Sequence, residues 1–211
     1  MSEEIAKILI DIESVNFSFK KFFTLTSGLK SPVYVDCRKI ISFTKERDFI
    51  INKAVQYLNE NNIDNEIIAG GETAGIPYAS FLSQKLHKPM IYIRKKPKGF
   101  GINKQIEGQF KKKQTTLLVE DLATDGGSKV TFVNAIRDAG LIVEDIFVIF
   151  YYDIFNFEKS DLFKLNVNIH SLCTWQDIVT YLERNKVYND DEILSLKEFL
   201  DDPESWRKKN G

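Results

Sequence analysis

The sequence has few of the residues that build covalent or metal-centred frameworks. Its 211 residues include two cysteines, Cys37 and Cys173, and two histidines, His87 and His170, none of them in a CxxC or HExxH arrangement. This excludes a scaffold stapled by several disulfides and argues against a structural zinc site. A chain of this length buries roughly 70% of the surface that its unfolded form exposes, so we expect a core that needs no staples.

Long apolar runs and the marks of a signal peptide are also missing. The longest apolar run, residues 146–152, has seven residues, against the roughly 20 that span a bilayer, and it predicts a buried strand. The first 14 residues carry Glu3, Glu4 and Asp11, which suits an amphipathic helix and not the basic start of a signal peptide. We therefore expect a cytoplasmic protein.

Neither sign of charge is in excess. The chain has 29 Lys and Arg against 30 Asp and Glu, a formal net charge of -1, which argues against a dedicated nucleic-acid binder because phosphate contacts need a surplus of basic charge. Basic residues nevertheless gather at Arg94, Lys95, Lys96 and Lys98, and again at 111–113. A local basic spot on a neutral protein fits a small anionic ligand; the alternative is an ordinary solvated surface.

The order of predicted elements indicates an α/β fold. Runs of β-branched and aromatic residues predict strands at 33–36, 66–69, 90–94, 115–120, 143–151 and 167–172, and helical patterns occupy 45–62, 75–86, 127–139, 175–185 and 191–200. Their alternation predicts a parallel sheet covered by helices on both faces, with a hairpin-like segment near residues 27–31. We expect one domain with an N-terminal hood at about 1–43, a core at about 44–172 and a helical tail at about 173–211.

The most informative stretch is the end of the most apolar of these strands and the loop after it. Two carboxylates, Glu120 and Asp121, are followed by Thr124, by glycines at 126–127 and by Ser128, just before a helix. Ligands of open α/β sheets bind beyond the carboxyl ends of strands. Glycines let backbone amides face an anion at a helix N-terminus, whereas the carboxylates suit vicinal hydroxyls or a hydrated magnesium ion. The stretch predicts a sugar-phosphate site; the alternative is an acidic turn in which Asp125 and Ser128 cap the helix.

The order of these residues resembles the phosphoribosyl pyrophosphate (PRPP) motif of type I phosphoribosyltransferases. Two positions depart from its commonest form: Ala123 replaces a larger aliphatic residue, and Asp125 stands where a small or hydroxyl residue is usual. The charge of Asp125 would repel a phosphate, so we expect this side chain to point outward or to accept backbone amides.

Three further segments are similar to orotate phosphoribosyltransferases, in the same order along the chain. Residues 23–38 resemble the family's N-terminal signature, 70–77 its loop contacting pyrophosphate, and 94–108 its mobile catalytic loop. The resemblance covers about residues 22–152. It implies a type I phosphoribosyltransferase fold and transfer of the phosphoribosyl group from PRPP to orotate, which gives orotidine 5'-phosphate and pyrophosphate in pyrimidine synthesis.

The resemblance also implies partners and site residues. It implies a homodimer whose catalytic loop closes over the neighbouring subunit's site, and magnesium held through PRPP and water near the acidic pair. Catalysis would use Arg94, Lys95 and Lys98, whose charge meets the leaving pyrophosphate. PRPP would contact Glu120, Asp121, Thr124, Asp125, Gly126, Gly127, Ser128, Thr73 and Ala74, and orotate would contact Thr26, Tyr34, Val35 and Thr124.

Several polar positions common in that family are replaced here. Thr26 and Ala74 stand where lysine is usual, Phe100 stands where histidine is common, and 151–153 replaces an aspartate-arginine pair. Phe100 cannot exchange protons, so acid-base work would fall to Lys98, Lys95 or pyrophosphate itself. The replacements predict a differently built orotate pocket.

Two alternatives stay open at this point. One is a phosphoribosyltransferase for another base, against which the 23–38 signature speaks. The other is a PRPP-sensing regulator without catalysis, against which the cationic loop and the neutral net charge speak. Residues 170–211 predict no chemistry, and we expect Trp175 and Trp206 to be packing anchors.

Overall fold

The computed structural model describes residues 2–25, 28–97, 105–124, 127–155 and 157–210, and of Ser128 and Lys159 the backbone only. The chain divides into two compact units: a smaller one of Met1–Glu46 with Cys173–Gly211, and a larger one of Arg47–Leu172. The larger unit spans nearly the residues expected for the core. The expected hood and tail share the other unit, an association that the sequence pattern did not indicate. That the whole chain is one folding domain stays a prediction.

The larger unit is built on a six-stranded sheet in the order β10-β9-β8-β5-β6-β7. β5 pairs in parallel with β6 and β8, β8 pairs in parallel with β9, and β7 joins β6 antiparallel. The strands are β5 (Ile67–Gly71), β6 (Met90–Ile93), β7 (Ile106–Glu107), β8 (Thr115–Ala123), β9 (Ile142–Tyr151) and β10 (Asn168–Thr174).

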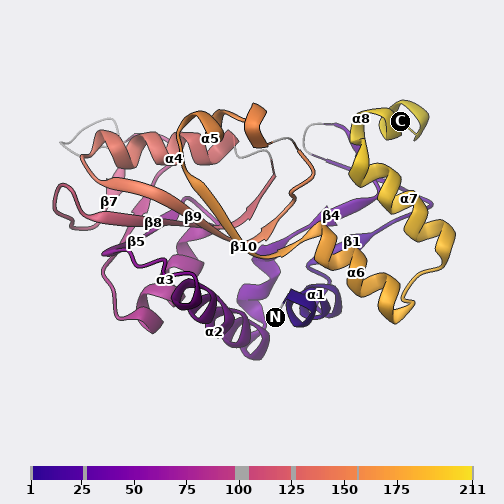
Figure 1. The fold of residues 1–211 in the computed structure, drawn as a ribbon, viewed down its shortest axis with the longest axis horizontal. Helices are drawn as coiled ribbons and strands as arrows, with labels where there is room; N and C mark the ends of the chain where they lie inside the picture. The colour runs from indigo at the N-terminus through magenta and orange to yellow at the C-terminus, as the bar shows by residue number, and fades with distance from the viewer. Residues whose placement is uncertain (1, 26–27, 98–104, 125–126, 156, 211) are drawn as a thin grey trace. The chain divides into compact units, whose positions relative to one another are not determined.

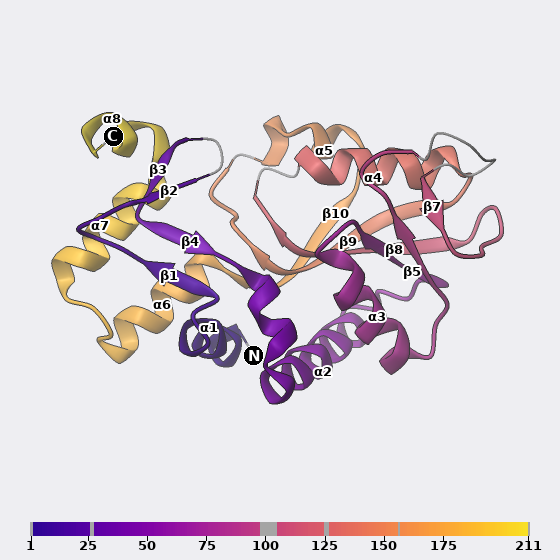
Figure 2. The same ribbon diagram turned by 180° about the vertical axis from the view of Figure 1, so that it is seen from behind.

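Helices cover both faces of this sheet, as predicted. α2 (Thr44–Glu60) and α3 (Gly75–Leu86) lie on one face, and α4 (Gly127–Asp138) and the short α5 (Asp161–Lys164), which follows η2 (Phe157–Lys159), lie on the other (Figures 1 and 2). None of the helices within the described ranges is long and apolar enough to cross a membrane.

The central strands are apolar because both of their faces are covered. Leu117, Leu118 and Val119 of β8 are buried, as is the whole of 146–150 in β9, so the apolar run at 146–152 supplies a buried strand, as predicted. These strands pack with the helices into one cluster that includes Ile67, Ala69, Ile91, Ile93, Phe132, Val133, Ile136 and Ile146.

The register of the sheet brings three strand ends to one edge. Gly70 of β5 pairs with Val119 of β8, and Gly71 pairs with Ile93 of β6. The segments that follow β5 and β6 therefore leave the sheet side by side, next to the last residues of β8, which continues to Ala123.

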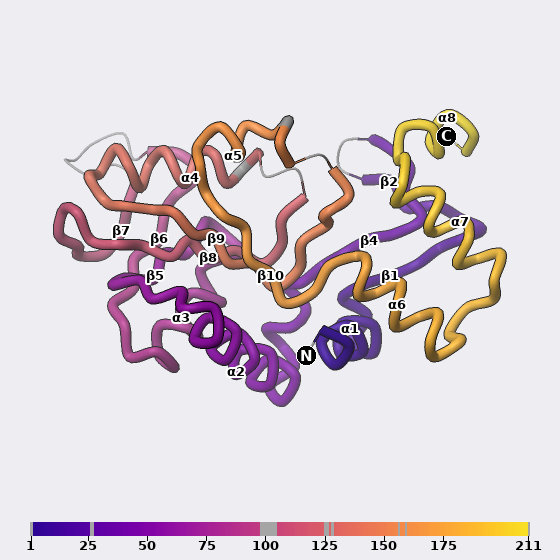
Figure 3. Tube along the Cα trace, viewed as in Figure 1, coloured from indigo at the N-terminus to yellow at the C-terminus, as the bar shows by residue number. Residues whose placement is uncertain are grey.

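The smaller unit combines the N-terminal strands with the C-terminal helices (Figure 3). β1 (Val15–Phe17) pairs with β4 (Val33–Val35), and β2 (Phe23–Thr24) pairs with β3 (Lys30–Ser31). The remaining elements are α1 (Ser2–Asp11), η1 (Cys37–Ser42), α6 (Trp175–Asn185), α7 (Asp190–Asp201) and α8 (Pro203–Asn210).

Local sequence fixes where the C-terminal helices begin. α6 and α7 each start at a capping box, formed by Thr174 with Asp177 and by Asn189 with Glu192, which satisfies amides that the first turn leaves unpaired. Trp175 is buried with its ring 6.2 Å from that of Phe17. The expectation that the tryptophans are packing anchors is confirmed for Trp175, and Trp206 is buried likewise.

Candidate active site

The segments after β5 and β6 are tied together at the edge of the sheet. The Lys95 amide donates to Glu72 Oε2 at 2.7 Å, and the Glu72 amide donates to the Ile93 carbonyl at 2.8 Å. The Lys95 side chain is exposed. These bonds place an exposed cation beside the loop that the sequence assigns to pyrophosphate.

The loop after β5 opens onto the N-terminus of α3. Thr73 is exposed, and Ala74, at the cap position, gives the helix no side-chain hydrogen bond. The Glu72–Thr73 peptide bond is cis. α3 runs for 12 residues, and its first amides face the same edge as Lys95, an arrangement that favours an anion. The predicted PRPP residues Thr73 and Ala74 thus lie where a phosphate group would be stabilised.

Glu120 is a buried carboxylate paired with a buried lysine. It is 6% exposed, and its Oε2 lies 3.3 Å from Lys129 Nζ, which also donates to the Leu122 carbonyl at 2.6 Å. Oε1 has no hydrogen-bond partner among the residues described. Burial raises the pKa of Glu120 to about 7. The positive charges of Lys129 and, from the segment after β6, of Lys95 oppose this rise, and the negative charge of neighbouring Asp121 adds to it.

Two glycines leave room for this carboxylate. A Cβ atom at Gly71 would lie 2.2 Å from Glu120 Oε1, and one at Gly75 would lie 2.3 Å from the Val119 carbonyl oxygen and 2.5 Å from Glu120 Oε1. Any side chain at either position would collide with β8. Gly71 and Gly75 therefore allow β5 and α3 to pack closely against the acidic strand.

The acidic pair lies inside β8 and not at its last residues. The sequence predicted a strand end near residue 120, but β8 continues to Ala123 because its pairing with β9 continues, with Glu120 opposite Val148 and Ala123 opposite Tyr151. Successive strand residues point to opposite faces, so the two carboxylates diverge. Asp121 is 8% exposed and Thr124 is half-buried.

The segment that replaces the family's aspartate-arginine pair also reaches this edge. The Tyr152 amide donates to the Ala123 carbonyl at 2.9 Å, so the 151–153 segment lies directly beside the end of β8. Burial raises the pKa of Tyr151 and of Asp153. The segment that stands in place of the family's aspartate-arginine pair therefore contributes the phenol of Tyr151 and the carboxyl group of Asp153 near the end of β8.

The remaining predicted residues are placed in part. Tyr34 and Val35 lie on β4 in the smaller unit, with Tyr34 37% exposed and Val35 buried. Gly127 begins α4. The predictions for Thr26, Lys98, Phe100, Asp125 and Gly126 lie outside the described residues, as does the one for the Ser128 side chain.

Arg94 is held at the base of the predicted catalytic loop. Its amide donates to the Gln105 carbonyl at 2.8 Å, and Gln105 Nε2 donates back to the Arg94 carbonyl at 2.9 Å. Arg94 Nη1 lies 3.6 Å from Glu107 Oε1. Arg94 and Gln105 are therefore held together beside the site.

Lys129 is the site residue that sequence reasoning missed. Its signal was present: Lys129 stands three, four and seven residues before Phe132, Val133 and Ile136, all buried on α4. That spacing is the apolar stripe of an amphipathic helix, and a lysine within it predicts a buried carboxylate partner because an unpaired buried charge is costly.

Comparisons with known proteins agree with this fold. No family model matches the chain. The chain is 44% identical over 214 residues to the orotate phosphoribosyltransferase of Roseobacter denitrificans, covering 100% of this chain and 94% of the relative. It is 41% identical over 213 residues to that of Sinorhizobium medicae, covering 100% and 92%.

Solved structures give the same result. The orotate phosphoribosyltransferase of Aeropyrum pernix superposes with a TM-score of 0.73 at 26% identity, covering 88% of this chain and 99% of that one. The Leishmania donovani UMP synthase gives a TM-score of 0.77 at 28% identity, covering 94% of this chain and 42% of that one. With 41–44% identity to these relatives along its whole length, the chain belongs to the orotate phosphoribosyltransferase family.

Proposed function

We propose that the chain transfers the phosphoribosyl group from PRPP to orotate and releases orotidine 5'-phosphate and pyrophosphate. The observation that carries this is the sheet edge that collects an exposed Lys95, the open N-terminus of α3 at Thr73 and the acidic end of β8. Together they offer cationic and amide donors to phosphate groups and carboxylates to sugar hydroxyls. The names of the relatives support orotate as the acceptor base.

Lys95 is the cation best placed to serve the leaving group. Displacing pyrophosphate from the anomeric carbon develops negative charge on its oxygens, which a preorganised cation and helix amides stabilise. The ammonium group of Lys95 is exposed, whereas Arg94 is partly neutralised by Glu107 at 3.6 Å. Arg94 thus anchors the loop, and Lys95 together with the α3 N-terminus meets the pyrophosphate.

The acidic strand recognises the ribose. Glu120 Oε1 is a buried acceptor with no hydrogen-bond partner within the described part of the chain, so a ribose hydroxyl would reach it only if the segments of Gly71 and Gly75 that pack against it move. A carboxylate at this place would repel phosphate and favour hydroxyl groups, so Glu120 and Asp121 orient the sugar while Thr73 and Lys95 hold the phosphates. The lysine partner of Glu120 keeps its charge compensated when PRPP is absent.

The residues at this edge fit magnesium only if PRPP supplies most of its ligands. No group of three or more His, Cys, Asp or Glu side chains that could hold a metal ion occurs in the described ranges. Magnesium takes six oxygen ligands and readily keeps waters and phosphate oxygens, so Glu120 and Asp121 would hold it through PRPP and water. When bound, the ion neutralises pyrophosphate charge.

A homodimer in the cytoplasm completes the proposal. The family resemblance supports a dimer whose loop residues reach the neighbouring subunit's site. Both cysteines are free and buried, as is usual in reducing compartments.

The test follows orotate absorbance after mixing the protein with PRPP and magnesium, with adenine, hypoxanthine and uracil assayed in parallel. Loss of orotate with no product from the other bases supports the proposal. Turnover of a different base would overturn the choice of substrate, and PRPP binding without turnover would favour a sensor.

The same assay tests the role of Lys95. Lys95→Ala should lower kcat by about 100-fold, the usual effect of removing one donor to a developing anion, while PRPP still binds. The matched control is Lys85→Ala, an exposed lysine in the last turn of α3 at the opposite end of that helix, which should keep full activity. Wild-type activity in Lys95→Ala would remove this residue from the mechanism.

A further inference from the structure

The C-terminal helix α8 is joined to the β2–β3 hairpin by a charged hydrogen bond. Arg207 Nε donates to the Lys30 carbonyl at 3.1 Å, and the Arg207 guanidinium lies 5.6 Å from the centre of the Phe199 ring. The bond links residues 177 positions apart in the sequence, both within the smaller unit. The tail therefore contacts the segment that carries the family's N-terminal signature.

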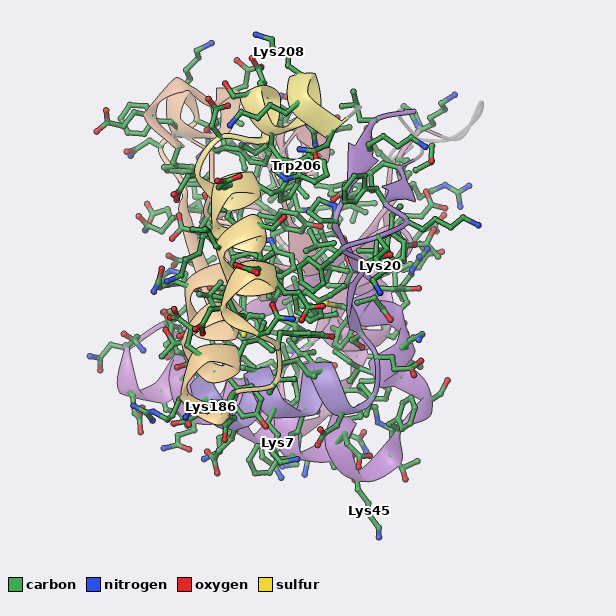
Figure 4. The ribbon with its side chains drawn as sticks, turned by 90° about the vertical axis from the view of Figure 1, so that its right-hand side faces the viewer. Lys7, Lys20, Lys45, Lys186, Trp206 and Lys208 are labelled. Carbon is green, nitrogen blue, oxygen red and sulfur yellow. The ribbon has the colours of Figure 1, made fainter. Side chains whose placement is uncertain are left out.

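An aromatic cluster fixes α8 in place beneath this bond. Trp206 is 3% exposed, with its ring centre 4.6 Å from that of Phe22 and 5.2 Å from that of Phe199, both edge-on. Figure 4 shows Trp206 on the inner side of α8 and Lys208 extending away from the molecule. Such pairs stabilise beyond their burial, so α8 presents Arg207 to the hairpin in one orientation.

The hairpin needs this support because it is small. β2 and β3 have two residues each, and an isolated hairpin of any length is marginal in water. Within the described residues its own bonds include Lys30 Nζ to Thr24 Oγ1 at 3.1 Å and the Leu25 amide to the Leu29 carbonyl at 2.9 Å. The position of the hairpin therefore depends on what packs against it.

The hairpin in turn leads into the strand assigned to the base. Ser31, at the end of β3, is buried, and its hydroxyl donates to the Val33 carbonyl at 2.7 Å. The Phe23 ring lies 5.9 Å from that of Tyr34. A shift of the Lys30 carbonyl would thus reach Tyr34 along residues 31–33 and through the contact between the Phe23 and Tyr34 rings.

We propose that α8 supports the orotate-contacting segment and that Arg207 is a positioning residue for orotate. This deepens the proposed function and rests on it, because the family resemblance assigns Tyr34 and Val35 to orotate only if orotate is the substrate. The PRPP contacts are assigned to residues of the larger unit, so α8 should affect the two substrates differently. The C-terminal tail then has a part in recognising the base.

The test compares KM for the two substrates in Arg207→Ala, Arg207→Lys and Lys208→Ala. Arg207→Ala should raise the KM for orotate about tenfold, which corresponds to losing one hydrogen bond from a charged donor, with the KM for PRPP and kcat within about twofold. Arg207→Lys should restore part of the loss because an ammonium group can donate to the same carbonyl. Lys208→Ala, on the outward side of α8, should match the wild type.

A second readout needs no substrate and separates this inference from the proposed function. Amide hydrogen exchange over residues 23–35 should be faster in Arg207→Ala than in Lys208→Ala. Faster exchange without any orotate turnover by the wild type would defeat the proposed function and leave the support by α8 standing. Unchanged exchange, or equal rises in both KM values, would overturn the role of Arg207.

Discussion

Glu120 combines burial, a neighbouring carboxylate and a compensating lysine. Desolvation raises its pKa to about 7, although the Lys129 ammonium lies 3.3 Å away. A buried pair of this kind contributes little net stability, but removing one partner leaves a charge uncompensated. The physical role of Lys129 is therefore to let a carboxylate remain in a closely packed strand.

The pKa of Glu120 predicts how stability depends on pH. The folded value of about 7 lies above the ordinary value of 4.5, so the folded chain holds a proton that the unfolded chain releases. This contribution is fully present below pH 4.5 and is lost as pH rises through about 7. Relative to Glu120→Gln, the unfolding free energy of the wild type should therefore fall by about 3 kcal/mol as pH rises over this range.

Urea unfolding of both proteins at pH values from 5 to 8, without PRPP or magnesium, measures this difference. The substitution Glu66→Gln provides the control, because that carboxylate also accepts hydrogen bonds, from Thr115, but at an exposed site. Parallel pH profiles for the wild type and Glu120→Gln would show that Glu120 titrates near its ordinary value, and would contradict the burial argument.

At the scale of elements, the contact of β5 and α3 with β8 depends on glycine. A Cβ at Gly71 would meet the Glu120 side chain, whereas a Cβ at Gly75 would meet the Val119 carbonyl oxygen at 2.3 Å. A side chain can be removed and a backbone carbonyl cannot. The two glycines should therefore respond differently when Glu120 is shortened.

We expect Gly71→Ala and Gly75→Ala each to cost about 3 kcal/mol or more, as overpacking in a close-packed core does. In a Glu120→Ala background, the cost of Gly71→Ala should fall, with the contact to Phe132 at 2.7 Å remaining. The cost of Gly75→Ala should stay. Thermal unfolding of the wild type, the three single variants and the two double variants measures this, and equal relief at both positions would show that the backbone of β8 gives way.

The elements were largely predictable because periodicity reports burial. The predicted helices at 75–86 and 175–185 match α3 and α6 at both ends, and α7 differs by one residue at each end. The end of β8 was misplaced because its polar residues signal a loop, while the strand continues through pairing with β9. β7 and α8 were not predicted. β7 has two residues and α8 is short and polar, so neither has enough apolar periodicity to be recognised.

The site was predictable where a motif is local and not where partners are distant. Glu120, Asp121 and Thr73 stand in segments that a sequence reader recognises. Lys129 is buried through tertiary packing, and Arg207 meets Lys30 across 177 positions. Contacts of that kind depend on how elements pack, which no short sequence pattern specifies.

At the scale of the whole molecule, the smaller unit joins distant parts of the chain, whereas the larger unit is one continuous segment. The chain leaves the smaller unit after Glu46 and returns to it at Cys173, so its first and last segments pack together in one unit. The Arg184 guanidinium donates to Glu3 Oε2 at 2.7 Å, which ties α6 to α1. Substitutions in the tail should therefore be judged by their effect on the N-terminal strands.

The proposed dimer predicts which lysines act within their own subunit. The Lys95 amide donates to Glu72 Oε2, next to Thr73 of the same chain, so we expect Lys95 to serve its own site. The family resemblance implies a loop at 94–108 that closes over the neighbouring subunit's site, and we expect Lys98, farther along that loop than Lys95, to reach that site. The two lysines should therefore behave differently when inactive subunits are combined.

A dimer purified with two affinity tags should separate these cases. Pairing Lys98→Ala with Asp121→Ala subunits places both defects in one site and leaves the other intact, so the hybrid should have about half the wild-type activity. Pairing Lys95→Ala with Asp121→Ala leaves one defect in each site and should stay inactive. Inactivity of both hybrids would place Lys98 in its own subunit's site. A monomeric wild type in sedimentation would contradict shared active sites altogether, because each chain would then have to supply every cation that its own pyrophosphate requires.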